Sequence, residues 1–209
     1  MSRRSFSGFF LGPVLIMVAI VIIVNLWNHT QAPLGDDRID GDFQILGAVR
    51  LEENPGNDGD SFHIQHSTEV DVYRLYFVDA CEKSDRFRSR LGHQARYFGE
   101  LKERDVLDLG AQARDQTLTW LGKEPFEIYT RGERVMNGER LYAMVRFPQA
   151  PEGQQWLCER LVQAGLARIY TRGTALADGR SRAAFEKYLR KIESEAKKAK
   201  RGAWSLSGS

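Results

Sequence analysis

The stretch YRLYFVDACEKSD, residues 73–85, is the part of the sequence on which the interpretation of the fold depends. Its first half alternates apolar residues with Arg74, which predicts a strand with two distinct faces. Asp79 and Glu82 follow just past the end of that strand. A strand with a solvated tip is the simplest interpretation. The alternative is a site where a rigidly held arginine meets two carboxylates.

More strands are predicted on both sides of this stretch. Helices are predicted between and after them, and a turn at Asn137-Gly138 is predicted to join the last two strands. This succession predicts an α+β fold, and a small closed five-stranded OB-like β-barrel with packed helices fits the number of strands. The predicted strands are residues 43–51, 61–65, 70–79, 125–132 and 140–147, and the predicted helices are residues 110–122, 152–167 and 181–200.

The length and composition suit one compact domain with an appendage. The chain has 209 residues, of which 42% are apolar and 28% charged, and its net charge is +2. Arg3 and Arg4 supply that excess, because residues 31–209 hold 28 basic and 28 acidic side chains. The predicted folded part therefore lacks the general basic field that drives non-specific binding to duplex DNA.

The N-terminus carries a long apolar run, residues 9–27, without a single charge. At about 1.5 Å per residue a helix of this length spans roughly 28 Å, which matches the hydrocarbon core of a bilayer. The basic flank, residues 1–8, is expected to stay in the cytoplasm. We therefore expect a single-pass anchor in the cell membrane and a C-terminal domain outside the cytoplasm, periplasmic or extracellular. A cleaved signal peptide is the alternative.

Residues 28–42 are polar, acidic and interrupted by Gly and Pro, which predicts a linker. The folded domain is predicted over residues 43–206. Within it, Asp58-Gly59-Asp60 forms a turn that leads into a strand. Asp60 at the start of one strand and Asp79 at the end of the next could meet, because paired strands bring such ends together, and two carboxylates with carbonyls and water suffice for a hard cation.

Taken in order, these motifs resemble the staphylococcal nuclease-like (thermonuclease) domain family over most of residues 43–206. The family's DGD-[TS] turn matches residues 58–61, and its Arg-x-x-x-x-Asp-x-x-Glu strand end matches Arg74, Asp79 and Glu82. A later family arginine matches Arg140, which follows a turn. The sequence QAGLA at residues 163–167 and the closing helix with its Trp-Ser ending, residues 189–205, also match.

The resemblance implies calcium-dependent hydrolysis of phosphodiester bonds in single-stranded or unwound DNA and in RNA, with little sequence specificity. It implies Ca²⁺ ligands at Asp60, Asp79 and the backbone carbonyl of Ala80. Glu82 is implied to orient or deprotonate the attacking water. Arg74 and Arg140 are implied to clamp the phosphate, since guanidinium groups match phosphate oxygens in two-point contacts. We expect a monomer.

Several positions depart from the family pattern. Ala80-Cys81 replaces the usual Thr-Pro between the aspartate and the glutamate, and Asn137-Gly138-Glu139 replaces a basic-aromatic pair before Arg140. Residues 83–104 form a long insertion with an excess of basic side chains and three aromatic rings. This insertion is interpreted either as a solvated helix or loop, or as a segment that follows the phosphates of a single strand.

Two other functions remain open at this point. A catalytically inactive nuclease-like module could bind nucleic acid or a protein partner at the membrane, and an envelope scaffold could pack its barrel against a membrane protein. A disulfide between Cys81 and Cys158 is also open. His63 and His66 are interpreted as packing or surface residues.

Overall fold

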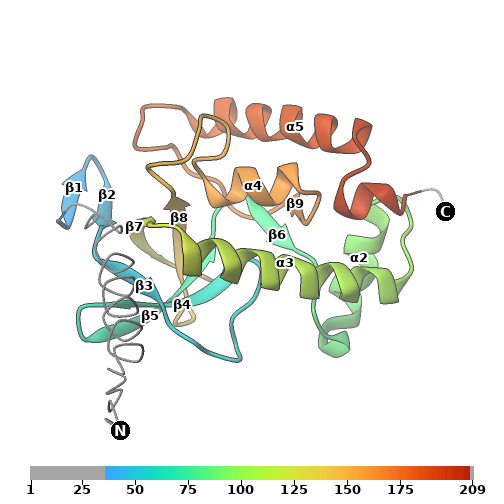
Figure 1. Cartoon of the computed structure of the whole chain (residues 1–209), viewed down its shortest axis with the longest axis horizontal. Helices are drawn as coiled ribbons and strands as arrows, with labels where there is room; N and C mark the ends of the chain where they lie inside the picture. The colour runs from blue at the N-terminus through green and yellow to red at the C-terminus, as the bar shows by residue number, and fades with distance from the viewer. Residues whose placement is uncertain (1–35, 208–209) are drawn as a thin grey trace, which may run out of the picture. The chain divides into compact units, whose positions relative to one another are not determined.

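Nine strands and four α-helices make up residues 36–207, the part of the chain that the computed structural model describes (Figure 1). The α+β class predicted from the sequence is confirmed. The predicted flank at residues 1–8 and the predicted membrane span at residues 9–27 lie outside the described residues. Within residues 36–207, no helix combines the length and the apolar character needed to cross a membrane.

Seven strands form one mixed sheet and two form a small second sheet. In the large sheet the hydrogen-bonded order is β1-β2-β7-β8-β5-β4-β3, and all neighbours are antiparallel except β5 and β8. In the small sheet β6 pairs with β9. The strands are β1 (Arg38–Asp40), β2 (Phe43–Leu46), β3 (Val49–Leu51), β4 (Ser61–His66), β5 (Glu69–Leu75), β6 (Val78–Ala80), β7 (Glu127–Arg134), β8 (Leu141–Arg146) and β9 (Ala167–Ile169).

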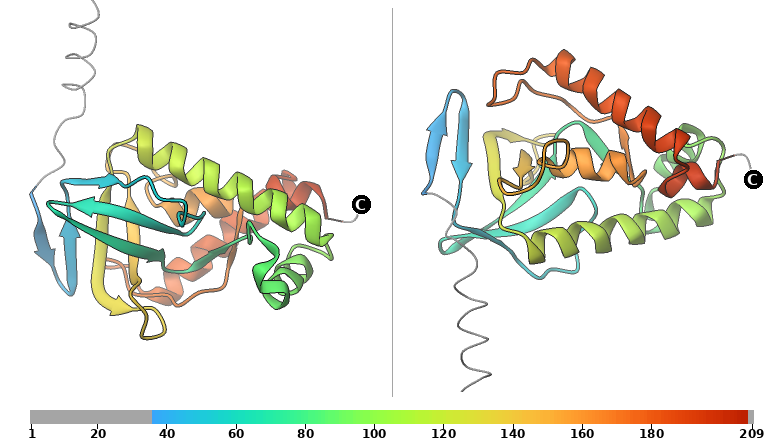
Figure 2. Two further views of the ribbon diagram at one scale, coloured as in Figure 1. Left: turned by 90° about the horizontal axis from the view of Figure 1, so that it is seen from below. Right: turned by 45° about the horizontal axis from the view of Figure 1, so that its top comes forward.

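The predicted closed five-stranded barrel is wrong, because the large sheet has an open order with β1 and β3 at its ends. Strand β1 also lies inside the predicted linker. The predicted strand at residues 43–51 is bent into β2 and β3, which pair with β7 and β4 respectively. The sheet therefore curves, as Figure 2 shows. Its strands bury apolar side chains such as Phe62, Ile64 and Val145 in the core.

A second predicted strand, residues 70–79, is broken at Phe77. This residue has a φ of 70°, a conformation that non-glycine residues seldom adopt. Its ring is fully buried and lies 5.0 Å, between ring centroids, from that of Phe185. Its amide and carbonyl bond to Arg172 and Tyr170, which lie after β9. The break sends β6 away from the large sheet and towards β9, so that Asp79 lies opposite Arg168.

The helices cover the sheets and agree in part with the predicted ones. The predicted helix at residues 152–167 is shortened, because Gly153 (φ 81°) precedes it and Gly165 (φ 69°) ends it. Ser181 caps the last helix by accepting a hydrogen bond from the amide of Ala184. The helices are α2 (Arg88–Tyr97), α3 (Glu103–Lys123), α4 (Leu157–Gln163) and α5 (Arg182–Lys198), with short 3₁₀ turns at Asp85–Phe87 and Gly202–Ser205.

The C-terminal turn packs onto the end of α2. The ring of Trp204 lies 4.8 Å from that of Phe98, the residue that follows α2, and the Ser207 hydroxyl donates to the carbonyl of Phe98. The amide of Ala203 donates to the carbonyl of Gly165 at 3.0 Å. The last residues described thus fasten α2 to the end of α4.

Helix α3 packs very closely on the turn that carries Glu82, at Gly110. A Cβ at Gly110 would lie 2.3 Å from the carbonyl oxygen of Glu82, whereas one at Gly122 of the same helix would meet nothing within 4 Å. We expect Gly110→Ala to lower the free energy of unfolding by about 1–3 kcal/mol or more, through overpacking. Gly122→Ala, the matched control, is expected to raise it by about 0.5–1 kcal/mol. Urea unfolding of both variants measures the difference, and equal effects would contradict the close packing.

Candidate active site

The strand pairings bring together charged residues that are far apart in the sequence. Ser61, directly after Asp60, pairs with Arg74 across β4 and β5. Asp79 pairs with Arg168 across β6 and β9. The amide of Leu75 donates to the carbonyl of Asp60 at 2.9 Å. Asp60, Arg74 and Asp79 therefore share one buried end of the sheets.

Arg74 connects the two aspartates directly. Its Nη1 donates to Oδ1 of Asp60 at 2.7 Å, and its Nη2 donates to Oδ1 of Asp79 at 2.6 Å. All three residues are buried, with Arg74 only 7% exposed. Oδ2 of Asp60 also accepts the backbone N–H of Ala80 at 2.6 Å. A single guanidinium group thus holds both carboxylates, and Arg74 itself is enclosed by them.

Asp79 is the most heavily bonded carboxylate of the site. Besides Arg74, its Oδ1 accepts a hydrogen bond from Arg90 at 2.9 Å. Its Oδ2 accepts from Gln94 at 2.9 Å and from Arg168 at 2.8 Å. A carboxylate offers about four lone-pair positions, so these four donors saturate it.

Glu82 lies one turn further on and is held by Arg90. Nη2 of Arg90 lies 2.8 Å from Oε1 of Glu82, while the backbone N–H of Glu82 donates to Oε1 of Gln94 at 2.8 Å. Arg90 is the most exposed of the arginines in contact with these acids, with 38% of its side chain accessible. Burial raises the pKa of Glu82 above its usual value, and the charge of Arg90 opposes this. A raised pKa suits a general base that works near neutral pH.

These residues form a network that we name the carboxylate–arginine cluster. Burial raises the pKa of Asp60 to about 6, against the opposing charge of Arg74. Burial also acts on Asp79, but Arg74, Gln94 and the other arginines outweigh it and hold the pKa of Asp79 below its usual range. Asp79 therefore stays ionised at neutral pH. The cluster consists of the acids Asp60, Asp79 and Glu82 and the arginines Arg74, Arg90 and Arg168.

Arg140 lies beside the cluster, directly before β8. Its Nη1 donates to the hydroxyl of Ser61 at 3.3 Å, and that hydroxyl lies 3.4 Å from Oδ1 of Asp60. Arg140 is exposed, unlike Arg74. The site residues predicted from the sequence thus lie together. Arg90, which contacts Asp79 and Glu82, and Arg140, which contacts Ser61 next to Asp60, are more accessible than Arg74.

As arranged, the predicted calcium ligands do not fit a calcium ion. Calcium takes six to eight oxygen ligands. Both oxygens of Asp79 face N–H donors, and the carbonyl of Ala80 accepts a hydrogen bond from Gln94 at 2.8 Å. Among the described residues, no three His, Cys, Asp or Glu side chains are grouped so as to hold a metal ion. Entry of a cation between Asp79 and Glu82 requires the half-exposed Arg90 to leave.

This geometry makes a prediction for Arg90→Ala. Removing a positive charge that contacts two carboxylates should strengthen calcium binding by about tenfold or more. Calorimetric titration of the full chain with calcium measures the change. Arg88→Ala is the control, since Arg88 is an exposed arginine of the same helix that forms no ion pair within residues 36–207. Equal calcium affinities in the two variants would show that Arg90 does not obstruct a cation.

Sequence reasoning missed three members of the site. Arg90 and Gln94 lie in the insertion at residues 83–104, for which a solvated helix or loop was the simpler interpretation, yet one face of α2 is buried against the cluster. Their spacing of four residues, which places both on one helix face, was the available signal. Arg168 follows the QAGLA motif and gave no signal, because only the break at Phe77 brings β6 to β9.

Other candidates lie apart from the cluster or are inert. His63 bonds to Asn57, and His66 pairs with Asp37. Cys81 and Cys158 are both free and buried, so the structure contains no disulfide between them. Burial raises the pKa of both thiols, which keeps them protonated.

Comparisons with known proteins add no independent assignment. No family model and no curated protein matches the chain, so a function must be argued from the carboxylate–arginine cluster itself.

Proposed function

We propose that the chain is a nuclease that hydrolyses phosphodiester bonds of single-stranded or unwound DNA and of RNA at the carboxylate–arginine cluster. The observation that supports this most is the contact of one buried guanidinium, Arg74, with both Asp60 and Asp79. Burying such an ionic network costs desolvation energy, and a protein with hydrophobic residues of similar volume in its place is often at least as stable. Stability alone therefore does not account for the network. Acidic side chains with shifted pKa values that lie close together are typical of functional sites.

The accessible arginines are suited to bind the substrate phosphate. Arg90 contacts Glu82, Arg140 contacts Ser61 next to Asp60, and guanidinium groups match phosphate oxygens. As negative charge develops on these oxygens during hydrolysis, fixed cations stabilise it. The buried Arg74 and Arg168 then act by holding Asp60 and Asp79 in place. Glu82, with its raised pKa, takes the proton of the attacking water.

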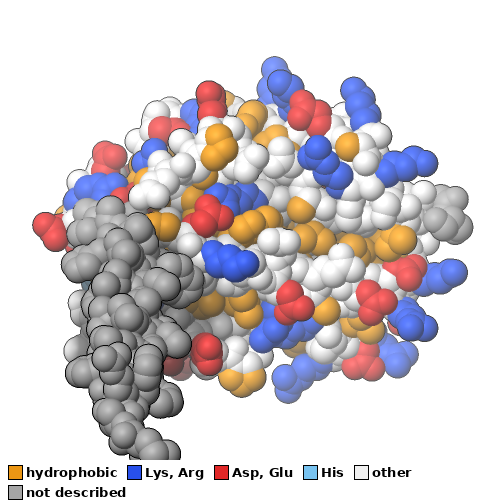
Figure 3. Space-filling model, in the orientation of Figure 1, with side chains coloured by type: hydrophobic (Ala, Val, Ile, Leu, Met, Phe, Trp, Pro, Cys, Tyr) orange, Lys and Arg blue, Asp and Glu red, His pale blue; other side chains and the backbone are white. Residues whose placement is uncertain are grey.

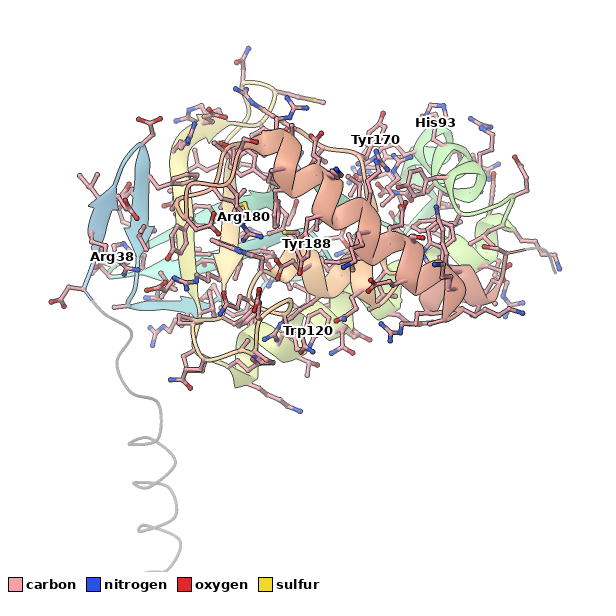
Figure 4. The ribbon with its side chains drawn as sticks, turned by 90° about the horizontal axis from the view of Figure 1, so that it is seen from above. Arg38, His93, Trp120, Tyr170, Arg180 and Tyr188 are labelled. Atoms are coloured by element: carbon pink, nitrogen blue, oxygen red, sulfur yellow. The ribbon has the colours of Figure 1, made fainter. Side chains whose placement is uncertain are left out.

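Exposed aromatic rings beside the cluster favour a nucleic-acid substrate. Phe87 is 50% exposed and lies 5.9 Å from the guanidinium of Arg90, and Tyr170 is 63% exposed and lies 3.9 Å from that of Arg168. Figure 4 shows Tyr170 and His93, the latter on α2, at the same end of the domain. Aromatic rings next to basic groups stack unpaired bases without sequence preference.

The outer side of α5 carries charges of both signs on the face drawn in Figure 3. Lys and Arg side chains stand along the outer side of α5, with Asp and Glu side chains among them. Several form ion pairs within that helix, such as Arg182 with Glu186. Mixed charges of this kind suit a solvated helix face.

The family resemblance implies calcium, so the test of the proposed function is carried out with and without this ion. The full chain, as wild type and as Glu82→Gln, is incubated with a single-stranded oligodeoxynucleotide or with RNA. Each reaction is carried out once with calcium and once with a chelator. Cleavage that is lost in Glu82→Gln supports the proposed nuclease. Loss in the chelator would show that cleavage requires a divalent cation, and a cation at Asp79 would have to displace its arginines.

A catalytically inactive binding module is the second candidate. The saturation of Asp79 by four donors favours it, since a purely structural network would have the same bonds. Binding of the oligonucleotide without cleavage under every condition would identify this module.

We also propose that residues 9–27 anchor the chain in the cell membrane with the domain outside the cytoplasm. The uncharged run and the basic flank support this. A tag after Ser209 that is digested only when protease reaches the outer side supports the orientation. Digestion from the cytoplasmic side would reverse it.

A further inference from the structure

The turn that carries Asp79 and Glu82 has few restraints of its own. Strand β6 is three residues long, and β9 is its hydrogen-bonded partner. Ala80 and Cys81 separate the two acids, so the turn lacks a proline that would fix a backbone angle. A catalytic carboxylate at the end of such a turn requires support from elsewhere in the fold.

Gln94 of α2 supplies this support with its whole amide group. Its Nε2 donates to Oδ2 of Asp79 at 2.9 Å and to the carbonyl of Ala80 at 2.8 Å. Its Oε1 accepts the backbone N–H of Glu82 at 2.8 Å. Each of these bonds ends on a different residue of the turn, so the amide spans it from Asp79 to Glu82.

The position of Gln94 is well defined. Its side chain is fully buried, at 0% exposure, on the face of α2 that also carries the fully buried Leu91. Arg90 lies one helical turn earlier and contacts the side chains of Asp79 and Glu82. The C-terminal turn fixes the other end of α2 through Phe98. Gln94 is therefore held by the core and reaches the backbone of the turn, where solvent cannot replace its bonds.

We propose that Gln94 is a positioning residue that sets the place of Glu82 relative to Asp79 and does not touch the substrate. This inference rests on the proposed nuclease function for its catalytic meaning. The amide group itself is required, because its nitrogen donates two hydrogen bonds while its oxygen accepts a third. A side chain of the same size without the amide leaves the carbonyl of Ala80 and the N–H of Glu82 without partners.

The test compares Gln94→Met with Gln112→Met in the full chain. Methionine keeps the length of glutamine and removes its hydrogen bonds, and Gln112 is an exposed glutamine on α3. Peptide-resolved hydrogen exchange should show residues 79–84 exchanging about tenfold faster or more in Gln94→Met, with other segments unchanged. Cleavage of single-stranded DNA should show kcat lower by about 100-fold and KM altered less than about threefold, because misplacement by about 1 Å is enough for such a loss. Gln112→Met should match the wild type in both.

The outcomes separate this inference from the proposed function. If residues 79–84 exchange faster in Gln94→Met but the wild type cleaves no nucleic acid, Gln94 would hold the turn as proposed and the proposed nuclease function would be overturned. Unchanged exchange there, or an unchanged kcat in an active enzyme, would overturn the positioning role. If Gln94→Met fails to fold, Gln94→Asn gives the same test, since it retains the amide but is too short to reach all three partners. A rise in exchange across all segments in Gln94→Asn, with kcat lower only in proportion to the loss of folded protein, would show a merely structural residue and overturn the positioning role.

Discussion

Arg74→Met is expected to abolish cleavage and to lower the free energy of unfolding by about 3–5 kcal/mol, the usual cost of breaking a buried ion pair from one side. Without the guanidinium, the buried carboxylate of Asp60 loses its ion pair and keeps the backbone N–H of Ala80, whereas Asp79 keeps Arg90 and Arg168. Urea unfolding and an oligonucleotide cleavage assay measure the two effects. Arg50→Met is the matched control, since Arg50 is an exposed strand arginine bonded to Gln65. Equal stability of Arg74→Met and Arg50→Met would contradict the bridging role.

The pH dependence of this variant follows from Asp60. In the wild type its folded-state pKa, about 6, lies above the unfolded value near 3.9. A group of this kind contributes stability that is fully present below the unfolded pKa and lost as the pH rises through the folded pKa. Removing Arg74 takes away the main opposing charge. The stability deficit of Arg74→Met should therefore shrink as the pH falls from 7 to 5, and a deficit that grows on acidification would contradict this assignment.

Glu82→Gln is expected to lower kcat by about 10²–10⁴, the range of general base catalysis, with little change in melting temperature. Glutamine preserves the size of the side chain and can still accept a hydrogen bond from Arg90, but it cannot take a proton. Single-turnover cleavage and thermal unfolding measure the two quantities. Glu139→Gln is the control, because Glu139 is an exposed residue next to Arg140 and its substitution removes the same single negative charge. A cleavage rate equal to that of the control would exclude Glu82 as the base.

Much of the fold was predictable because local patterns agree with the final structure. The alternation in residues 61–65 places Phe62 and Ile64 in the core, and the amphipathic pattern of α5 buries Phe185, Leu189 and Ile192. The break at Phe77 was not predictable. Phenylalanine carries no local signal for a positive φ, and the conformation is imposed by tertiary bonds to residues 170 and 172. The same kind of long-range pairing makes the sheet open instead of closed.

The candidate site, like the fold, could be predicted from the sequence only in part. Asp60, Arg74, Asp79 and Glu82 were located from short motifs, because their spacing is set by one turn and one strand end. The saturation of Asp79 could not be predicted, since it depends on where α2 and β9 dock. Sequence patterns therefore predicted acids that the structure brings together, and left their electrostatic state open.

The fastening of α2 by the C-terminal turn makes the carboxylate–arginine cluster depend on segments far along the chain. Arg168 and the segment around Trp204 follow the acids by many residues in the sequence, yet the former holds Asp79 and the latter secures the helix that carries Arg90 and Gln94. A clipped chain that lacks these segments therefore has an incomplete carboxylate–arginine cluster. For a protein proposed to cut nucleic acids, proteolysis between α4 and Trp204 would then act as an off-switch, even where Asp60, Asp79 and Glu82 are all still present.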